Sequence, residues 1–268
     1  MEDYVVDLDS DHPGFHDPDY RLRRDEIAGL APPITAVADP ERVAYTDVER
    51  TTWSTVFERL TALYPSRACD AFNDVVGDLG YTANEIPQLA DVSAFLTERT
   101  GFRLQPVAGL VSAREFLGKL AQRTFCSTQY IRHHSQPFYT PEPDIVHELM
   151  GHAPMLAIPD FANLSQKIGE GSLQATDEQV EQLATLYWFT IEYGVLRTSA
   201  GYRAYGAGLL SSFGELEHAL SGDVEIRRFD PFRAKDTSYP ITTYQPLLWW
   251  VESIGEAFKK IDDFVQSM

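Results

Sequence analysis

The segment PDIVHELMGHAP, residues 143–154, carries two of the chain's seven histidines and decides how the surrounding fold is interpreted. In the zinc-protease pattern H-E-x-x-H, two histidines stand four residues apart on one face of an α-helix. Here His147 and His152 are five residues apart. On a regular α-helix this spacing turns two side chains about 140° away from each other. Local geometry must therefore bring the two imidazoles together if they are to bind one ion.

The neighbouring residues suggest how the two histidines converge. Asp144 is a suitable N-cap residue, and Gly151 is suited to the left-handed conformation that ends many helices. Pro154 then prevents the helix from resuming. We therefore expect His147 on a short helix that stops at Gly151, with His152 beyond the stop and free to turn back. In that geometry Glu148 need not act as a protease base.

Glu192 is the best candidate for a third ligand. Its neighbours at helical spacing are all apolar: Trp188, Phe189, Val195 and Leu196. A carboxylate on such a face is costly to bury unless it is paired with a cation or a metal, so a buried salt bridge to an arginine is the alternative. Two histidines and a carboxylate suit either zinc or the facial triad of non-haem Fe(II) oxygenases. The donor chemistry alone leaves both metals open.

Composition excludes several classes of protein. A formal net charge of −18 over 268 residues argues against a nucleic-acid partner, because phosphate binding needs a basic surface. No stretch approaches a membrane span, and the acidic N-terminus lacks the features of a signal peptide. The two cysteines give no disulfide framework. We therefore expect a cytoplasmic protein without a membrane or nucleic-acid partner.

Hydrophobic periodicity predicts a mostly α fold with minor β structure. The clearest helix begins near Thr176, where Thr176 and Gln179 form a capping-box pair. Other segments with helical spacing are 47–64, 66–79, 88–99 and 111–125. Strands are expected at 101–109 and 238–246.

Four long motifs resemble one enzyme family. They are STQYIRH (127–133), YTPEPDIVHELMGH (139–152), LATLYWFTIEYG (183–194) and AYGAGLLSSFGEL (204–216). Together they resemble the pterin-dependent aromatic amino acid hydroxylases, which act on phenylalanine, tyrosine or tryptophan. The likeness runs from HPGFHDPDY at His12 to Met268. It implies one catalytic domain over residues 12–268, preceded by an acidic tail, residues 1–11.

The resemblance also implies the cofactors. It predicts mononuclear Fe(II) held by His147, His152 and Glu192, with tetrahydrobiopterin and O₂ as the other reactants. One oxygen atom would enter the substrate ring and the other would leave on the pterin. The pterin would stack on Phe116, although Phe116 also sits at ordinary core spacing. The other residues expected around the pterin are Gly109, Val111, Ala113, Glu148, Ala184 and Tyr187.

The same likeness assigns the amino acid site. Arg132 would clamp the substrate carboxylate through its bidentate fork, with Asp144 as an orienting partner. Thr140, Gly208 and Ser211 would line the amino-acid end, and Ser211 is alternatively a partner of a histidine ligand. Pro143 and Trp188 would flank the aromatic ring, and Ile241 would border the same pocket.

Substrate choice depends on two of these positions. At Trp188 the chain resembles the phenylalanine and tyrosine enzymes. It resembles the tryptophan enzymes instead at Ile241 and in the segment HALSGDVEIRRFDP (218–231). Tyrosine enzymes carry an acidic residue at the position of Ile241. We therefore rank phenylalanine first, as in phenylalanine hydroxylases, giving tyrosine or meta-tyrosine. A tryptophan 5-hydroxylase is the alternative and tyrosine is the poorest substrate; a zinc hydrolase and an inactive ligand-binding relative remain as remote alternatives.

The ends of the likeness lead to an expectation about assembly. Eleven residues before His12 are too few for a domain, and no coiled-coil heptads follow the final helical segment. The charge of −18 also makes copies of the chain repel one another at low salt. A monomer is expected.

Overall fold

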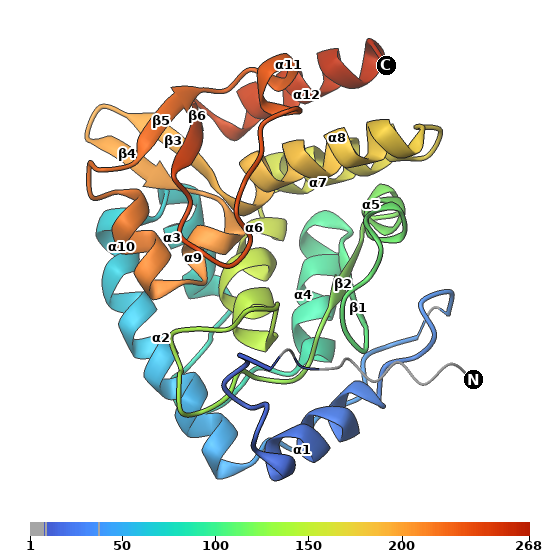
Figure 1. Ribbon diagram of the computed structural model, residues 1–268, viewed down its shortest axis with the longest axis vertical. Helices are drawn as coiled ribbons and strands as arrows, with labels where there is room; N and C mark the ends of the chain where they lie inside the picture. Colours follow the sequence, from blue (N-terminus) through green and yellow to red (C-terminus); the bar gives the residue numbers. More distant parts are fainter. Residues whose placement is uncertain (1–7, 9, 37) are drawn as a thin grey trace.

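The computed structural model describes residues 8, 10–36 and 38–268 of the chain (Figure 1). Most of the expected acidic tail, residues 1–7 and 9, therefore lies outside the described residues. Among the described residues, helices dominate and the strands are short, which confirms the expected mostly α class with minor β structure.

Four helices come first along the described part of the chain: α1 (Pro18–Ala28), α2 (Asp47–Arg67), α3 (Asp70–Asp78) and α4 (Leu89–Thr100). The predicted start of α2 at Asp47 is confirmed, because Thr46 and Glu49 form a reciprocal capping box there. The helix expected at 66–79 is wrong at its start. Residues 66 and 67 still belong to α2, which continues through Pro65, and α3 begins only after a break at Cys69.

The next segment is a parallel strand pair joined by a helix. Strand β1 (Arg103–Pro106) pairs with β2 (Thr124–Ser127), and α5 (Ala113–Ala121) connects them. The strand expected at 101–109 is present, but it is shorter than predicted. The helix expected at 111–125 is too long at both ends, because Ser112 caps its start and Thr124 and Phe125 belong to β2.

The central helices follow, and they carry the residues of interest. They are η1 (His147–His152), α6 (Ala153–Leu156), α7 (Pro159–Ser172), α8 (Asp177–Tyr187) and η2 (Trp188–Glu192). The predicted capping box of Thr176 and Gln179 is present at the start of α8. Helix α7 packs closely on α5 because Gly169 has no side chain; a Cβ there would lie 2.3 Å from the Ala121 nitrogen. Figure 1 shows α7 and α8 lying side by side, in yellow.

A four-stranded sheet with the order β4-β3-β6-β5 lies near the C-terminus. Its strands are β3 (Gly194–Thr198), β4 (Gly201–Ala204), β5 (Glu225–Arg228) and β6 (Leu247–Val251); β3 and β4 pair antiparallel, and the other pairs are parallel. The remaining helices are α9 (Ala207–Leu210), α10 (Phe213–Ala219), α11 (Pro231–Ala234) and α12 (Ile254–Gln266).

The strand expected at 238–246 is wrong. That segment contains no strand, and β6 begins directly after it at Leu247. The carboxamide of Gln245 donates to the carbonyl oxygens of Pro240 (2.8 Å) and Thr243 (3.4 Å). These side-chain hydrogen bonds fold the segment back on itself, which competes with pairing in a sheet.

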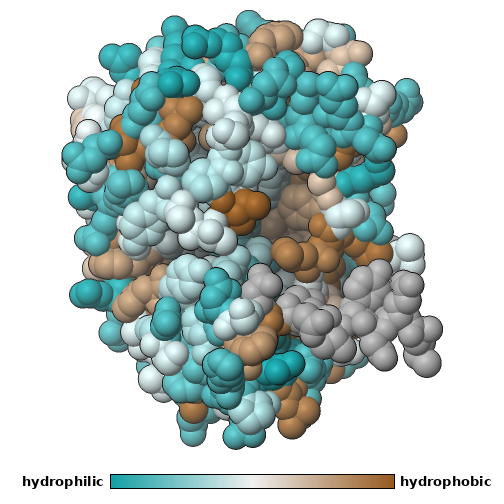
Figure 2. Space-filling model, in the orientation of Figure 1, coloured by the Kyte–Doolittle hydropathy of each residue, from teal (hydrophilic) through white to brown (hydrophobic). Residues whose placement is uncertain are grey.

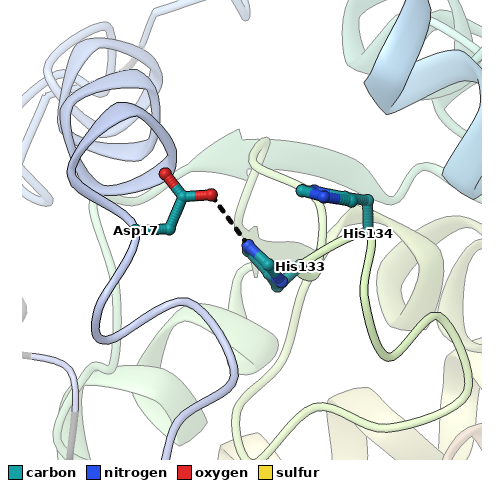
Figure 3. Close-up of side chains that lie close together, drawn as sticks. All are labelled: Asp17, His133 and His134. Atoms are coloured by element: carbon teal, nitrogen blue, oxygen red, sulfur yellow. Dashed lines mark hydrogen bonds and ion pairs between the residues drawn. The ribbon is translucent and has the colours of Figure 1, made fainter.

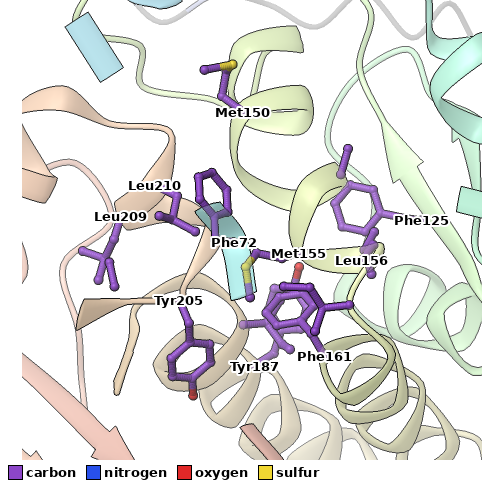
Figure 4. Close-up of a cluster of buried hydrophobic side chains, with 14 of the residues drawn as sticks. Phe72, Phe125, Met150, Met155, Leu156, Phe161, Tyr187, Tyr205, Leu209 and Leu210 are labelled. Carbon is purple, nitrogen blue, oxygen red and sulfur yellow. The ribbon is translucent and has the colours of Figure 1, made fainter. Parts of the chain in front are cut away.

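One continuous hydrophobic core surrounds η1 and α6. Figure 4 shows part of this core, with Met155, Leu156 and Phe161 among the labelled side chains. All three are at most 1% exposed. In Figure 2 the face seen in Figure 1 is mostly hydrophilic and is hollowed near its centre, where apolar residues gather. Among the described residues, no helix combines the length and the apolar character needed to cross a membrane.

Candidate active site

The two histidines are brought together by a π-helical turn, not by the helix stop that the sequence suggested. Residues 147–152 form η1, and the Ala153 N–H bonds to the Glu148 carbonyl five residues earlier. A π-helical turn contains one more residue than an α-helical turn, so side chains five apart come close to one face. Asp144 does accept the His147 N–H (3.1 Å), as expected of an N-cap.

Gly151 and Pro154 have roles different from those predicted. Gly151 does not have a positive φ, so it does not adopt the left-handed conformation that would end the helix. A Cβ on Gly151 would instead lie 2.5 Å from the carbonyl oxygen of Ala207, the first residue of α9. Pro154 lies in the first turn of α6, directly after η1, and the chain stays helical past it. Gly151 therefore permits close packing of α9 against η1.

This close packing brings Ser211, at the end of α9, against His147. The Ser211 hydroxyl donates to the Ala207 carbonyl (2.8 Å), and Ser211 Oγ lies 2.9 Å from His147 Nδ1. Because the hydroxyl proton is already used, the hydroxyl oxygen accepts from Nδ1–H. The Nε2 lone pair of His147 is consequently free. Burial lowers the pKa of His147 to about 4, so the ring is neutral near pH 7, as a metal ligand must be.

Three potential donors converge at one point. The Nε2 atoms of His147 and His152 are 2.9 Å apart, and His152 Nε2 lies 3.0 Å from Glu192 Oε1. The second carboxyl oxygen of Glu192 is 3.7 Å from His147 Nε2. With metal–ligand bonds of about 2.1 Å, neighbouring donors lie about 3.0 Å apart in an octahedral site and about 3.4 Å apart in a tetrahedral one. The two shortest separations match the octahedral value and the third exceeds both values, so the three groups lie close enough to bind one metal ion.

Glu192 is positioned by a second π-helical turn, η2, in which the Tyr193 N–H bonds to the Trp188 carbonyl (2.9 Å). Burial alone would raise the pKa of the Glu192 carboxyl. The positive charges that His152 and His147 can carry outweigh burial and lower this pKa to about 2. Glu192 is therefore ionised, which suits a cationic ligand. The alternative of a buried salt bridge to an arginine has no counterpart among the ion pairs of the described residues.

A second carboxyl group, that of Glu148, also approaches the histidines. Donor atoms of His147, Glu148 and His152 lie within 4.8 Å of one another. Glu148 Oε1 is occupied by the Thr128 N–H (3.1 Å) and the Thr128 hydroxyl (3.2 Å). Burial, together with the charge of Glu192, raises the pKa of Glu148 well above its usual value. Glu192 is the nearer and better ionised carboxylate, so it fits a metal better than Glu148 does.

Another cluster with possible metal-binding residues consists of Asp17, His133 and His134 (Figure 3). The Ser135 N–H can only donate, and it bonds to His133 Nδ1 (3.3 Å). His133 Nε2 therefore carries the proton and donates to Asp17 Oδ2 (3.1 Å). No lone pair remains on the His133 ring for a metal. Because Asp17 also caps α1, this cluster ties α1 to the segment that carries Arg132.

Arg132 and Asp144 form a buried ion pair with two contacts. Arg132 Nε donates to Asp144 Oδ2 (2.9 Å), and one terminal nitrogen donates to Oδ1 (2.7 Å). The other terminal nitrogen bonds to the Pro137 carbonyl (3.3 Å). Three of the five guanidinium N–H groups thus have partners among the described residues. The two that remain are one on each terminal nitrogen.

The expected substrate residues line one cavity of about 300 Å³, which is at the small end of the range for ligand sites. His147 and Glu192 form part of its wall. All seven positions expected to contact the amino acid are on the lining: Arg132, Thr140, Pro143, Trp188, Gly208, Ser211 and Ile241. The structure therefore brings the residues expected to contact the amino acid together with two of the proposed metal ligands, His147 and Glu192.

The residues expected around the pterin lie on α5, α8 and η1 and in the segment that leads into α5. The Phe116 ring packs edge-on against Tyr187, with centroids 5.3 Å apart. Tyr187 in turn lies parallel to His152 at 6.4 Å. Phe116 and Ala184 are partly exposed, as are Gly109 and Val111 before α5 and Ala113 at its start. An aromatic wall therefore leads from the partly exposed Phe116 to the histidine pair.

Two buried polar residues at the cavity were missed by the sequence reasoning. Glu215 on α10 lines the cavity, and the Gln245 N–H donates to its Oε1 (2.8 Å). Gln245 is 1% exposed, and its carboxamide oxygen accepts the indole N–H of Trp188 (3.0 Å). The apolar surroundings that singled out Glu192 do not exist around Glu215, because the residues at helical spacing from it are Ser211, Ser212, His218 and Ala219. The periodicity of the sequence therefore gave no signal for Glu215.

Comparisons with known proteins agree with these geometric features. The family model of the biopterin-dependent aromatic amino acid hydroxylases matches residues 1–268. A phenylalanine-4-hydroxylase of Caenorhabditis elegans is 50% identical over 269 residues, covering 99% of this chain and 59% of that protein. A tyrosine 3-monooxygenase of Bos taurus is also 50% identical, over 262 residues, covering 96% of this chain and 53% of that protein. The chain thus spans less than two thirds of the length of these relatives.

A solved structure is similar over most of the chain. The phenylalanine hydroxylase of Chromobacterium violaceum, with bound iron(III) and the oxidised cofactor 7,8-dihydrobiopterin, superposes with a TM-score of 0.81 at 32% identity. The match covers 92% of this chain and 90% of that one.

Proposed function

The chain belongs to the biopterin-dependent aromatic amino acid hydroxylases, and on that premise we propose that it hydroxylates the ring of L-phenylalanine, using Fe(II), tetrahydrobiopterin and O₂. The bound iron and the reduced pterin would supply the two electrons and the oxygen activation that ring hydroxylation needs. The chain itself would hold the metal, the flat cofactor and the amino acid in fixed relative positions.

His147, His152 and Glu192 would hold the iron. Their donor atoms converge at separations of 2.9–3.7 Å, which supports one metal ion bound from a single side; an iron held in this way would keep its opposite positions open. Ser211 would keep His147 in the tautomer that presents Nε2 to the metal.

Phe116 and Tyr187 would form the aromatic boundary of the pterin site. Gly109, Val111, Ala113 and Ala184 would complete its edges. One oxygen of Glu148 is held by Thr128, and its second oxygen would accept an N–H group of the pterin ring. Glu148 would thus orient the cofactor without binding the metal.

Arg132 would anchor the substrate carboxylate through the two N–H groups that Asp144 and Pro137 leave free. Thr140 and Gly208 would line the same end of the cavity. Pro143 and Trp188 would enclose the aromatic ring, and Ile241 would border it.

One observation carries the choice of phenylalanine. The indole N–H of Trp188 is turned to Gln245, so the indole offers the cavity no hydrogen-bond donor. Ile241 on the lining likewise offers no partner to a phenol. Where Trp188 and Ile241 border the substrate ring, a phenol would find no hydrogen-bond partner on these two side chains, which disfavours a hydroxylated ring, whereas a larger apolar ring is discriminated against only modestly. Overall sequence identity does not separate phenylalanine from tyrosine enzymes, because both are 50% identical to this chain.

The test is product analysis after incubation with Fe(II), a tetrahydropterin, O₂ and each of phenylalanine, tryptophan and tyrosine. We expect phenylalanine to be converted fastest, and the product's retention time distinguishes tyrosine from meta-tyrosine. Faster turnover of tryptophan would instead favour a tryptophan 5-hydroxylase. Iron-loaded protein that binds amino acid without turnover would indicate an inactive relative, and hydrolytic activity without O₂ and pterin would indicate a zinc hydrolase.

A further inference from the structure

Glu215 is a buried carboxyl group on the cavity wall for which the proposed chemistry has no use. It is 5% exposed, and burial raises its pKa to about 7. Its Oε1 accepts the main-chain N–H of Gln245 (2.8 Å), in the segment between α11 and β6. Burying a carboxyl group is costly, so a hydrogen bond that fixes this segment is its most direct benefit to the fold.

Gln245 links the segment that Glu215 holds to Trp188 in the cavity wall. Its carboxamide oxygen accepts from Trp188 Nε1 (3.0 Å), and its nitrogen donates to the Pro240 carbonyl (2.8 Å). An indole N–H can only donate and a carbonyl can only accept, so only one orientation of the carboxamide satisfies both partners. The side chain is therefore held at both ends, and its main chain is held by Glu215.

The Trp188 indole has further contacts that agree with a single orientation. It stacks on Tyr239 with ring centroids 4.4 Å apart and an interplanar angle of 15°, and it lies 4.6 Å from the Tyr193 ring. The stacking contacts allow the indole to slide or to flip over. The hydrogen bond to Gln245 is directional. Among these contacts it is the one that forms only when the N–H edge of the indole faces Gln245.

We propose that Gln245 and Glu215 are positioning residues that set substrate selectivity by fixing the indole of Trp188 in the cavity wall. This proposal rests on the proposed function, since it concerns the aromatic pocket of that site. Gln245 acts through Trp188 and is not on the cavity lining. Glu215 acts indirectly, through its hydrogen bond to the main-chain N–H of Gln245.

A double-mutant cycle between Trp188→Phe and Gln245→Ala tests the coupling. In the Trp188 chain, Gln245→Ala should lower the ratio of kcat/KM for phenylalanine to that for tryptophan by about tenfold, the effect of one misplaced apolar contact. In the Trp188→Phe chain no indole N–H exists, so the same change should leave the ratio within about twofold. Equal effects in both chains would overturn the proposal.

A second measurement does not depend on turnover. The indole N–H of Trp188 gives a nuclear magnetic resonance signal that Trp188→Phe identifies by its loss. Gln245→Ala should shift this signal and speed its hydrogen exchange at least tenfold. Glu215→Gln keeps a carbonyl acceptor for the residue 245 N–H and should preserve the signal, whereas Glu215→Ala should disturb it. An unchanged signal in both Gln245→Ala and Glu215→Ala would sink the proposal even if the chain hydroxylated nothing.

Gln105→Ala is the matched control. Gln105 is also a buried glutamine, 4% exposed, with its nitrogen bonded to the Ile34 carbonyl and its oxygen bonded to Lys119. The substitution Gln105→Ala removes a comparable number of side-chain hydrogen bonds, but at a place that does not line the cavity. We expect it to lower stability while leaving both the selectivity ratio and the Trp188 signal unchanged. If Gln105→Ala changed selectivity as much as Gln245→Ala, the effect would be general destabilisation and the positioning role would be rejected.

Discussion

His147 and His152 present their Nε2 atoms to each other at 2.9 Å across one π-helical turn. The spacing of five residues, which would separate the rings on an α-helix, is what brings them together here. Glu192 reaches the same point from the end of a second π-helical turn. The proposed metal site therefore depends on two local departures from the α-helix, each of which can be tested.

Iron binding should distinguish the two neighbouring carboxylates. We expect Glu192→Ala to lose most of its iron, because it removes the ionised group nearest to the histidines. Glu148→Ala should retain iron, since Glu148 is held by Thr128. Metal analysis after anaerobic loading and dialysis measures both variants. If Glu192→Ala kept the iron content of the wild type and Glu148→Ala lost its iron, Glu148 and not Glu192 would be the metal ligand.

Gly151→Ala should destabilise the protein and weaken the site. Its Cβ would lie 2.5 Å from the Ala207 carbonyl, so α9 must move away from η1. Overpacking of this kind lowers the free energy of unfolding by about 1–3 kcal/mol. Gly77→Ala in α3 is the control, because nothing lies within 4 Å of its Cβ and alanine favours helix. Denaturant unfolding compares the two; equal stabilities would show that η1 and α9 tolerate separation.

Arg132→Lys should impair amino-acid binding specifically. Lysine keeps the positive charge but cannot contact Asp144 through two nitrogens while offering two more N–H groups to a carboxylate. Loss of a charge-assisted hydrogen bond should raise the KM for phenylalanine about 10- to 100-fold. The KM for the pterin should change little. Steady-state kinetics with each substrate varied in turn measures both KM values. If both rose together, Arg132 would have a structural role and would not bind the amino acid.

Glu215 should make stability depend on pH in a defined window. Its folded-state pKa of about 7 is above the ordinary value of 4.5, so the folded chain binds this proton more tightly than the unfolded chain. Relative to Glu215→Gln, the wild type should therefore lose stability as pH rises from about 4.5 to about 7, and then level off. Thermal unfolding of both proteins across pH 4–8 measures the difference. A constant difference would contradict the raised pKa.

The sequence predicted the regular helices better than the site geometry. The starts of α2 and α8 were recognisable because capping boxes are local signals. The run LLWWV of β6 lacks the alternation of a half-exposed strand, and the Thr- and Tyr-rich residues before it attracted the strand prediction instead. Strand propensity was outweighed there by the hydrogen bonds of a single buried side chain, Gln245.

The three predicted metal ligands lie together, but the route by which they meet differs from the prediction. His147, His152 and Glu192 do converge, whereas the expected stop at Gly151 does not occur. Periodicity arguments compare a segment with 3.6-residue and 2-residue repeats, so a π-helical turn matches neither pattern. Gly151 looked like a helix terminator because the residue that needs its missing side chain, Ala207, is distant in sequence.

The π-helical turn at residues 147–152 also limits how such a site can arise or be engineered. Point substitutions change which side chains a helix displays but not the number of residues in a turn. Moving from an α-helical turn to this one requires inserting a residue, and deleting one would rotate His152 and everything after it away from His147. A search that allows only substitutions on a fixed-length helix would therefore never reach this site, although two histidines are easily placed on any helix.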